Sequence, residues 1–299
     1  MLHEVSLTSE PLDRFTPIIA SAHLQRLRQA MTTMGTVMAG RTLWHVNSTA
    51  AGGGVAEMLP FLLAYLRGAG VETRWVVVGG QPDFFAVTKR LHNLLHGSRG
   101  DGGGLGGDER ACYEAIAAAN AAQLTRRVRP GDVAVLHDPQ TAGLIGPLRE
   151  SGVTVIWRCH VGCDAPNDLA SSGWGFLRPY LEAADAFVFS RRGHVHDWMP
   201  RDKVRIVPPS IDPFATKNQT LDPEAARAIV GHLGLITANG AVPAYRDRDG
   251  RTVVVRRRAD IVRGGRTPSA STPLVVQVSR WDRLKDMLGV MRAFAAGVD

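Results

Sequence analysis

Short apolar runs recur between residues 42 and 207 and are separated by stretches with helical spacing. Each run has the length of a strand and few polar residues, as in strands that are buried on both faces of a parallel sheet. The predicted strands cover residues 42–46, 74–78, 133–136, 153–157, 186–189 and 204–207. The predicted helices cover residues 21–34, 55–66, 84–96, 108–127 and 223–233. This alternation predicts an α/β fold with a parallel sheet between helices.

The pattern changes after Pro208 and Pro209. Residues 236–272 are rich in Gly, Arg and Pro, with a hairpin strand expected within 251–258. Residues 274–278 (LVVQV) then predict a new strand, followed by a helix to position 299. One strand and one helix cannot bury a core alone, so we expect an incomplete second domain and a chain that is a fragment or stops early.

These changes divide the chain into four expected regions. They are an N-terminal helical extension (1–41), an α/β domain (42–222), a linker helix with an Arg-rich insertion (223–272) and the start of a second domain (273–299).

Composition narrows the cellular setting. Hydrophobic residues make up 44% of the 299 residues, the usual share for a globular protein. The polar N-terminus lacks the apolar block of a signal peptide, and no apolar run reaches the length of a membrane span. The three cysteines are few and odd in number. We therefore expect a cytoplasmic protein with no membrane partner.

The net charge of +7 is concentrated in one stretch. Residues 246–266 contain eight arginines and three aspartates, with only Tyr245 as an adjacent aromatic residue. Such a stretch could bind nucleic acid. Because no aromatic residues are interleaved with the arginines, we favour a solvated insertion and expect no nucleic-acid partner.

Three consecutive glycines, Gly52, Gly53 and Gly54, lie between a predicted strand and an amphipathic helix. Glycine lets the backbone approach a ligand, and the helix N-terminus suits a phosphate or sugar oxygen. The spacing is neither the dinucleotide fingerprint nor the Walker pattern. A tight turn is the alternative, but three glycines exceed what a turn needs.

Two polar motifs follow strands, where α/β folds bind ligands. Asp138 comes after the strand at 133–136 and could bind sugar hydroxyls, although a helix N-cap is an equal alternative. His160 comes after the strand at 153–157 and could bind a sugar hydroxyl or a peptide carbonyl near a reacting carbon, with a structural role as an equal alternative. Cys159 and Cys163 flank His160, but zinc is disfavoured because no fourth ligand has metal-like spacing.

Arg280 and Lys285 would project from the turn after the strand expected at 274–278. A guanidinium fork and an ammonium point charge suit a diphosphate leaving group. A solvated basic turn is an equal alternative.

Six segments in this order resemble the trehalose glycosyltransferring synthases, a retaining family related to the sucrose- and trehalose-phosphate-type synthases. The segments are HVNSTAAGGGVAEML (45–59), FFAVTKRLHNLLHG (84–97), VLHDPQTAGLI (135–145), WRCHVGCDAPN (157–167), VPPSIDP (207–213) and VSRWDRLKD (278–286). The first segment is the most specific, whereas SRxDxxK occurs in many related transferases.

The resemblance implies two Rossmann-like domains of the GT-B type, each with a doubly wound parallel sheet. It implies transfer of glucose from a nucleoside diphosphate glucose to glucose, giving α,α-trehalose with retention. The resemblance places Gly53 and Gly54 at the donor phosphate and sugar, Asp138 at a sugar hydroxyl, His160 at the donor glucose, and Arg280 and Lys285 at the departing diphosphate.

The resemblance also bears on cofactors and partners. It implies no cofactor and no metal, with a sugar donor and a sugar acceptor as small-molecule partners. Transfer to another sugar or to a sugar phosphate stays open, as does a sugar-binding fragment without catalysis. A homodimer is an option that the sequence does not decide. Family members continue beyond position 299 with a segment that holds the nucleotide ribose, so we expect impaired activity of this chain alone.

Overall fold

The computed structural model describes residues 2–238, 240–247 and 250–297 of the chain. Its contacts divide it into two compact units, Met1–Ser210 and Ile211–Asp299. Each unit is described below by itself.

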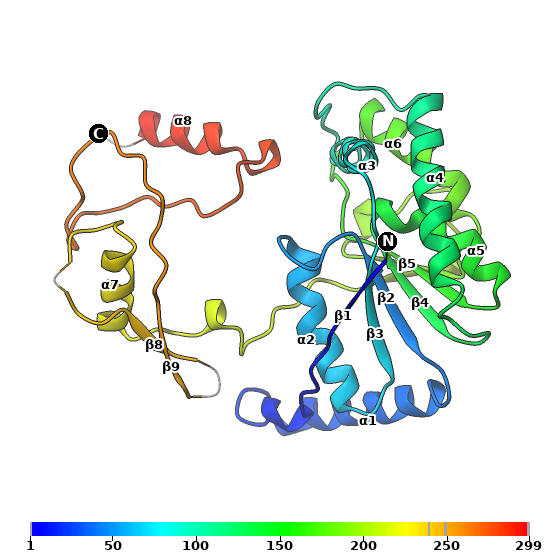
Figure 1. Ribbon diagram of the computed structural model, residues 1–299, viewed down its shortest axis with the longest axis horizontal. Helices are drawn as coiled ribbons and strands as arrows, with labels where there is room; N and C mark the ends of the chain where they lie inside the picture. Colours follow the sequence, from blue (N-terminus) through cyan, green and yellow to red (C-terminus); the bar gives the residue numbers. More distant parts are fainter. Residues whose placement is uncertain (1, 239, 248–249, 298–299) are drawn as a thin grey trace. The chain divides into compact units, whose positions relative to one another are not determined.

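The first unit is built on a seven-stranded sheet in the order β1-β3-β2-β4-β5-β6-β7 (Figure 1). The strands are β1 (His3–Val5), β2 (Leu43–Asn47), β3 (Thr73–Val77), β4 (Val133–His137), β5 (Thr154–Cys159), β6 (Ala186–Phe189) and β7 (Val204–Ile206). Strands β2 to β7 pair in parallel, and β1 runs antiparallel to β3. This arrangement confirms the predicted α/β fold with a doubly wound parallel sheet.

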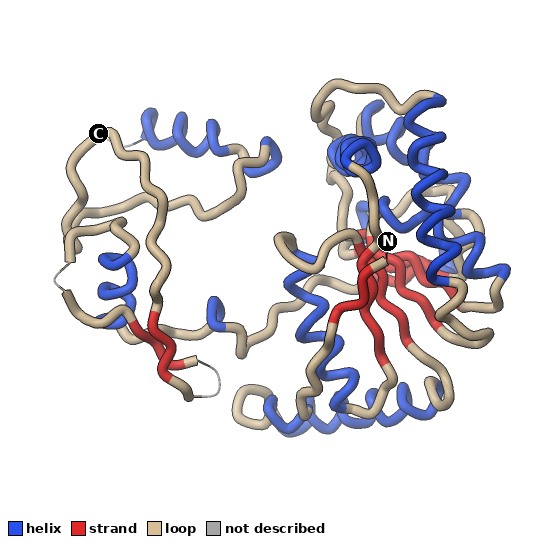
Figure 2. Tube along the Cα trace, in the orientation of Figure 1, coloured by secondary structure: helices blue, strands red, loops and turns tan. Residues whose placement is uncertain are grey.

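Helices cover the two faces of this sheet in separate layers (Figures 1 and 2). Helices α1 (Ser21–Val37) and α2 (Gly54–Gly68) pack with one apolar cluster, which includes Leu59, Leu63 and Trp75. The other cluster includes residues of the helices α3 (Pro82–Leu95), α4 (Gly107–Leu124), α5 (Ile145–Glu150) and α6 (Asp168–Leu181). Short 3-10 helices lie at Leu12–Phe15, Pro139–Leu144, Arg192–His194 and Arg201–Lys203.

The two faces of the strands are buried unequally. Every residue of β2 is buried, as the sequence predicts. In β4, β5 and β6, buried residues alternate with half-buried or exposed ones. The expectation that these strands are buried on both faces is therefore wrong for β3 to β7, because the first unit's helices cover their faces unequally.

The N-terminal 41 residues contain more than the expected helix. Strand β1 extends the sheet at the edge of β3, with His3 opposite Val77. The Leu2 N–H donates to Oε1 of Gln123 at the end of α4 and fixes the start of this strand. Three residues with a largely exposed pattern give no periodic signal, which explains why β1 is missed from sequence.

The described part of the second unit contains three short helices, a two-stranded hairpin and a terminal helix. Its elements are the 3-10 helix Thr216–Asn218, α7 (Pro223–His232), β8 (Ala244–Arg246), β9 (Thr252–Val254), the 3-10 helix Arg283–Lys285 and α8 (Met287–Gly297). The hairpin strand expected within 251–258 is confirmed by β9, which pairs antiparallel with β8. The predicted helix at the end of the chain is α8, and positions 298–299 lie outside the described residues.

The strand predicted at 274–278 is wrong. This segment has no strand structure, and Val275, Val276 and Val278 are exposed. A strand is stabilised by hydrogen bonds to a neighbouring strand, and the described part of the second unit gives this segment none. Among the described residues, no helix combines the length and apolar character needed to cross a membrane.

Candidate functional site

The chain path through the sheet creates a point where strand order reverses. From β2 the chain goes to β3 on one side of β2, and then to β4 on the other side. In α/β sheets of this kind, ligands bind at the carboxyl ends of the strands beside such a reversal. The loops after β2 and β4 carry Gly52–Gly54 and Asp138, so both predicted motifs lie in loops that leave this part of the sheet.

The glycine loop has the open backbone that the sequence predicts. Gly52 and Gly53 have φ values of 74° and 152°, which side chains rarely adopt, and Gly54 begins α2. A Cβ added at any of the three would meet no atom within 4 Å. The backbone conformation therefore requires glycine at positions 52 and 53, and all three glycines leave the space beside the loop open.

A buried asparagine holds the start of this loop. Asn47, at the end of β2, donates from Nδ2 to the Thr49 carbonyl at 2.7 Å. Its Oδ1 accepts the indole N–H of Trp75 at 2.8 Å. Both ends of the Asn47 amide are thus fixed, which anchors the turn before the glycines to β3.

Asp138 and His160 are brought together by the structure. Oδ1 of Asp138 accepts the His160 backbone N–H at 2.7 Å, which joins the loops after β4 and β5. The indole N–H of Trp157 donates to the Asp138 carbonyl at 3.1 Å. The carboxylate does not cap the 3-10 helix Pro139–Leu144, so the N-cap alternative is not supported.

The backbone and the charge of Asp138 are both unusual. Its φ of 64° is in the left-handed region, which few residues other than glycine occupy. Loss of hydration raises the pKa of its carboxyl to about 7, against the opposing effects of the His160 N–H and the Arg158 charge. Strained backbone and a shifted carboxyl pKa are features that cluster at functional sites.

Three histidine rings form a continuous chain from β2 to the loop after β5. His45 Nδ1 lies 3.0 Å from His137 Nε2, and His137 Nδ1 lies 3.0 Å from His160 Nε2. Neighbouring rings are stacked with centroids 5.3 Å apart. His45 and His137 are buried, and His160 is half-buried. The sequence interpretation identified His160 and missed the other two rings.

The histidine chain is electrically neutral at neutral pH. Burial, with a smaller effect of the Arg158 charge, lowers the pKa of His45 to about 3 and that of His160 to about 4. Burial and the neighbouring rings hold the pKa of His137 well below its usual value. Neutral imidazole carries one N–H donor and one acceptor, so each ring can link two partners.

The cysteines near His160 have structural surroundings. The Cys159 thiol is buried and donates to the Val161 carbonyl, and Cys163 donates to the Ala165 carbonyl. All three cysteines of the chain are free thiols. Within residues 2–238, 240–247 and 250–297, no group of three His, Cys, Asp or Glu side chains could hold a metal ion.

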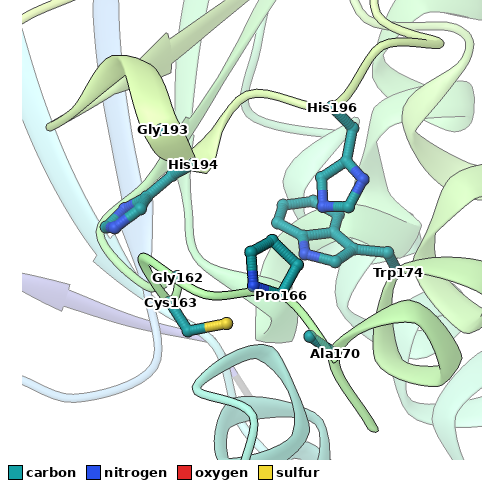
Figure 3. A pocket seen from close by; sticks show the side chains of 8 residues that line it. All are labelled: Gly162, Cys163, Pro166, Ala170, Trp174, Gly193, His194 and His196. Carbon is teal, nitrogen blue, oxygen red and sulfur yellow. The ribbon is translucent and has the colours of Figure 1, made fainter. Parts of the chain in front are cut away.

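A cavity of about 10 Å³ lies between the loops that follow β5 and β6 (Figure 3). Its lining includes Gly162, Cys163 and Pro166 from one loop and His194 and His196 from the other. The His196 ring lies 4.5 Å from that of Trp174. This volume holds about one water molecule, so the cavity is too small for a sugar.

Arg280 and Lys285 lie in the second unit, away in sequence from the histidine chain. Both are exposed. Arg280 has a long ion pair of 3.9 Å with Asp282, and the backbone N–H of Lys285 donates to the Asp282 carbonyl. Their proposed contact with a diphosphate stays a prediction.

Together, the fold and this edge of the sheet define an α/β protein with polar groups at a strand-order reversal, the place where sheets of this kind bind ligands. Residues 45–196, just over half of the chain, match the family model described as "Trehalose synthase, N-terminal domain". The chain therefore belongs to the trehalose synthase N-terminal domain family.

Individual relatives agree with this assignment. The chain is 34% identical to a trehalose synthase of Pyrococcus horikoshii over 74% of this chain and 51% of that protein. It is 33% identical to a trehalose synthase of Rubrobacter xylanophilus over 85% of this chain and 52% of that protein. The chain thus spans about half the length of these curated relatives.

A solved structure shows a weaker likeness. The α,α-trehalose-phosphate synthase (UDP-forming) from Burkholderia vietnamiensis is 19% identical, with a TM-score of 0.44, over 65% of this chain and 52% of that chain.

Proposed function

We propose that this chain is the acceptor-side part of a retaining glycosyltransferase that moves glucose from a nucleoside diphosphate glucose to free glucose. The product is α,α-trehalose. The observation that supports this most is the Asp138–His160 hydrogen bond at the carboxyl edge of the sheet, within the segment that matches the trehalose synthase family.

Asp138 and His160 have hydrogen-bonding capacity left for a sugar. The His160 N–H occupies one oxygen of Asp138, and a carboxyl group has further acceptor positions. With a pKa of about 7, the Asp138 carboxyl is partly protonated at neutral pH and can also donate. His160 keeps Nδ1, because His137 occupies Nε2. A sugar hydroxyl both donates and accepts, so it fits either group.

The glycine loop and the basic residues complete the proposed chemistry. Gly52–Gly54 offer exposed backbone without a Cβ in the way, which suits the donor phosphate and sugar. Arg280 and Lys285 would neutralise the diphosphate as it leaves. Such charge stabilisation is often the largest part of catalysis.

A binding measurement tests the sugar site. The chain is titrated with glucose and with UDP-, ADP- and GDP-glucose by calorimetry. We expect Asp138→Ala and His160→Ala to weaken the binding of at least one sugar roughly tenfold, the effect of one lost hydrogen bond to a buried partner. His23→Ala, on the exposed side of α1, is the matched control and should bind as the native chain does. If none of these sugars binds the native chain, the proposed site is wrong.

A turnover measurement tests the reaction. The same donors are incubated with glucose or glucose 6-phosphate, and non-reducing disaccharide is measured. Trehalose formed from free glucose supports the proposal, and product formed only from the sugar phosphate would identify the other acceptor. Sugar binding without product would identify a non-catalytic sugar-binding chain, an alternative that the half-length match to the relatives keeps open.

A further inference from the structure

His137 is the middle member of the histidine chain and uses both of its ring nitrogens. Its Nε2 faces His45 Nδ1, and its Nδ1 faces His160 Nε2, each at 3.0 Å. The three side chains come from β2, β4 and the loop after β5, which are neighbours in the sheet. The rings therefore link the interior of β2 to the loop that carries the proposed sugar contact.

The protons in this chain can be arranged in only two ways. Each hydrogen bond needs one proton between its nitrogens, and each neutral ring has one N–H. If His137 donates from Nδ1 to His160, then His45 must donate to His137, and His160 carries its proton on Nδ1. If His137 donates from Nε2 to His45, then His160 donates to His137, and its Nδ1 is a bare acceptor.

The outer nitrogen of His160 is therefore coupled to the state of His45, which lies two rings away. Among the described residues, the side chain of His160 has only His137 as a hydrogen-bonding partner. Its Nδ1 is thus the ring nitrogen that can meet a ligand. Whether a sugar hydroxyl must accept from Nδ1 or donate to it depends on which of the two arrangements the chain adopts.

We propose that His45 and His137 are positioning residues that hold His160 in one orientation and one tautomer for contact with a sugar hydroxyl. The proposal rests on the proposed function, because it takes His160 as the ring that meets the sugar. A ring fixed in advance loses less freedom on binding, and the hydrogen bond at one imidazole nitrogen sets the role of the other.

The charged groups around the rings keep the three histidines neutral and in place. Arg158 of β5 lies opposite His137 in the sheet register, and its charge acts on all three rings. Asp138 directly follows His137, and its carboxylate holds the His160 backbone by accepting the His160 N–H. Because burial and Arg158 both disfavour an added proton, the single-proton count above applies at neutral pH.

A measurement on the native chain tests the hydrogen bonds themselves. Long-range ¹H–¹⁵N spectra at pH 7.5 report which ring nitrogen of each histidine carries the proton. We expect His160 in one tautomer that exceeds the other roughly tenfold, and ¹⁵N–¹⁵N couplings across both contacts. Exposed His23 serves as the reference for a ring exchanging between tautomers. Two similar populations of His160, or no coupling, would overturn the proposal.

A distant substitution tests the coupling. His45→Phe keeps a ring in β2 but removes the partner of His137, and leaves the contact between His137 and His160 unchanged. We expect the tautomer ratio of His160 to fall at least threefold. On a logarithmic scale this is about half of the tenfold effect of one hydrogen bond. Val46→Ala, a buried neighbour on the other face of β2, is the matched control and should keep the native ratio. A native ratio in a folded His45→Phe chain would contradict the coupling, and the native spectra decide the matter if this variant does not fold.

Donor titration separates this proposal from the proposed function. UDP-, ADP- and GDP-glucose are added to native chain and to His45→Phe while the His160 resonances are followed. We expect binding to shift His160 Nδ1 and to be several-fold weaker in His45→Phe. If no donor shifts His160, the sugar contact is wrong and positioning for a sugar falls with it. If donors shift His160 but bind both chains equally, the proposed function stands and the positioning role does not.

Discussion

Strand β4 and the segment 274–278 have similar sequences but different structures. Both are runs dominated by aliphatic residues, VAVLH and LVVQV. β4 lies between β2 and β5 and pairs with both in parallel. In the segment 274–278, by contrast, Leu274, Val275, Val276 and Val278 are 51% to 92% exposed, and no strand pairs with them.

The difference shows what an apolar run specifies and what it does not. Hydrophobicity makes exposure unfavourable, but it supplies no partner for the backbone N–H and C=O groups. In the first unit, neighbouring strands provide those partners and helices cover the sheet. The described part of the second unit has a single hairpin, β8 with β9, and this hairpin does not extend to residues 274–278.

The largest expected difference between the two regions is in unfolding. Trp157 is fully buried in β5, and its ring contacts those of Trp174 and Phe189. Trp157→Ala should lower the free energy of unfolding by about 3–5 kcal/mol, the usual cost of emptying a buried aromatic site. Val276→Ala removes exposed side-chain atoms and should change it by less than about 0.5 kcal/mol. Urea unfolding followed by circular dichroism measures both, and equal losses would show that residues 274–278 are buried in solution.

Sequence periodicity located the paired strands and the long helices well. Strand β6 and the start of β4 lie where predicted, because a buried apolar run and its partners occur in the same domain. Helix α2 follows the spacing of Val55, Met58 and Leu59. Periodicity failed where pairing decides the structure. It missed β1, which depends on β3, and it predicted a strand at 274–278 that has no partner.

Acid should destabilise the first unit through the histidine chain. The folded-state pKa values of His45 and His160, about 3 and about 4, lie below the usual 6.5, and that of His137 is lowered as well. Stability from these groups is present above pH 6.5 and is lost as pH falls toward 4, because the unfolded chain takes up protons first. Asp138 acts in the opposite direction, since its raised pKa makes folding less favourable as pH rises from 4 to 7.

On acidification, the stability lost through the three histidines should exceed the stability gained through the Asp138 carboxyl. We expect a net loss of about 3–4 kcal/mol between pH 7 and pH 5, because each histidine loses about 1.4 kcal/mol per pH unit below 6.5 and the carboxyl group offsets about the same amount per unit below 7. Asp138→Asn keeps an oxygen for the His160 N–H but cannot titrate, so its loss on acidification should be larger than that of the native chain. Urea unfolding at the two pH values measures this. An equal loss in Asp138→Asn and the native chain would mean that the carboxyl is already ionised in the folded chain at pH 5.

The site was predicted one strand at a time, and this limited what could be found. Asp138 and His160 could be identified because each follows an apolar run. Their hydrogen bond depends on the register of β4 against β5, which pairs His137 with Arg158. His45 and His137 lie in strands, where a single histidine among apolar residues usually indicates packing. Three histidines in or directly after three neighbouring strands were the available signal, but the strand order was needed to use it.

The smallest expected difference concerns two helix caps. Asn167 begins α6 by accepting the Ala170 N–H and also donates to the Gly97 carbonyl at the end of α3. Asp222 begins α7 by accepting two N–H groups of its own first turn. α6 has six buried residues, whereas α7 has only Ala228.

Asn167→Ala should therefore lower global stability by about 1–2 kcal/mol, because it loses a cap and a tertiary hydrogen bond. Asp222→Ala should lower stability by about 1 kcal/mol or less, mainly within α7 as faster amide exchange, with little change in the urea midpoint.

Serine at either position keeps a capping oxygen and is the matched control. Asn167→Ser should recover only part of the loss, since serine is too short to replace both contacts, whereas Asp222→Ser should recover nearly all of it. A midpoint that shifts equally in both alanine variants would mean that α7 unfolds together with the sheet, and the contrast between the two units would then not hold for this helix.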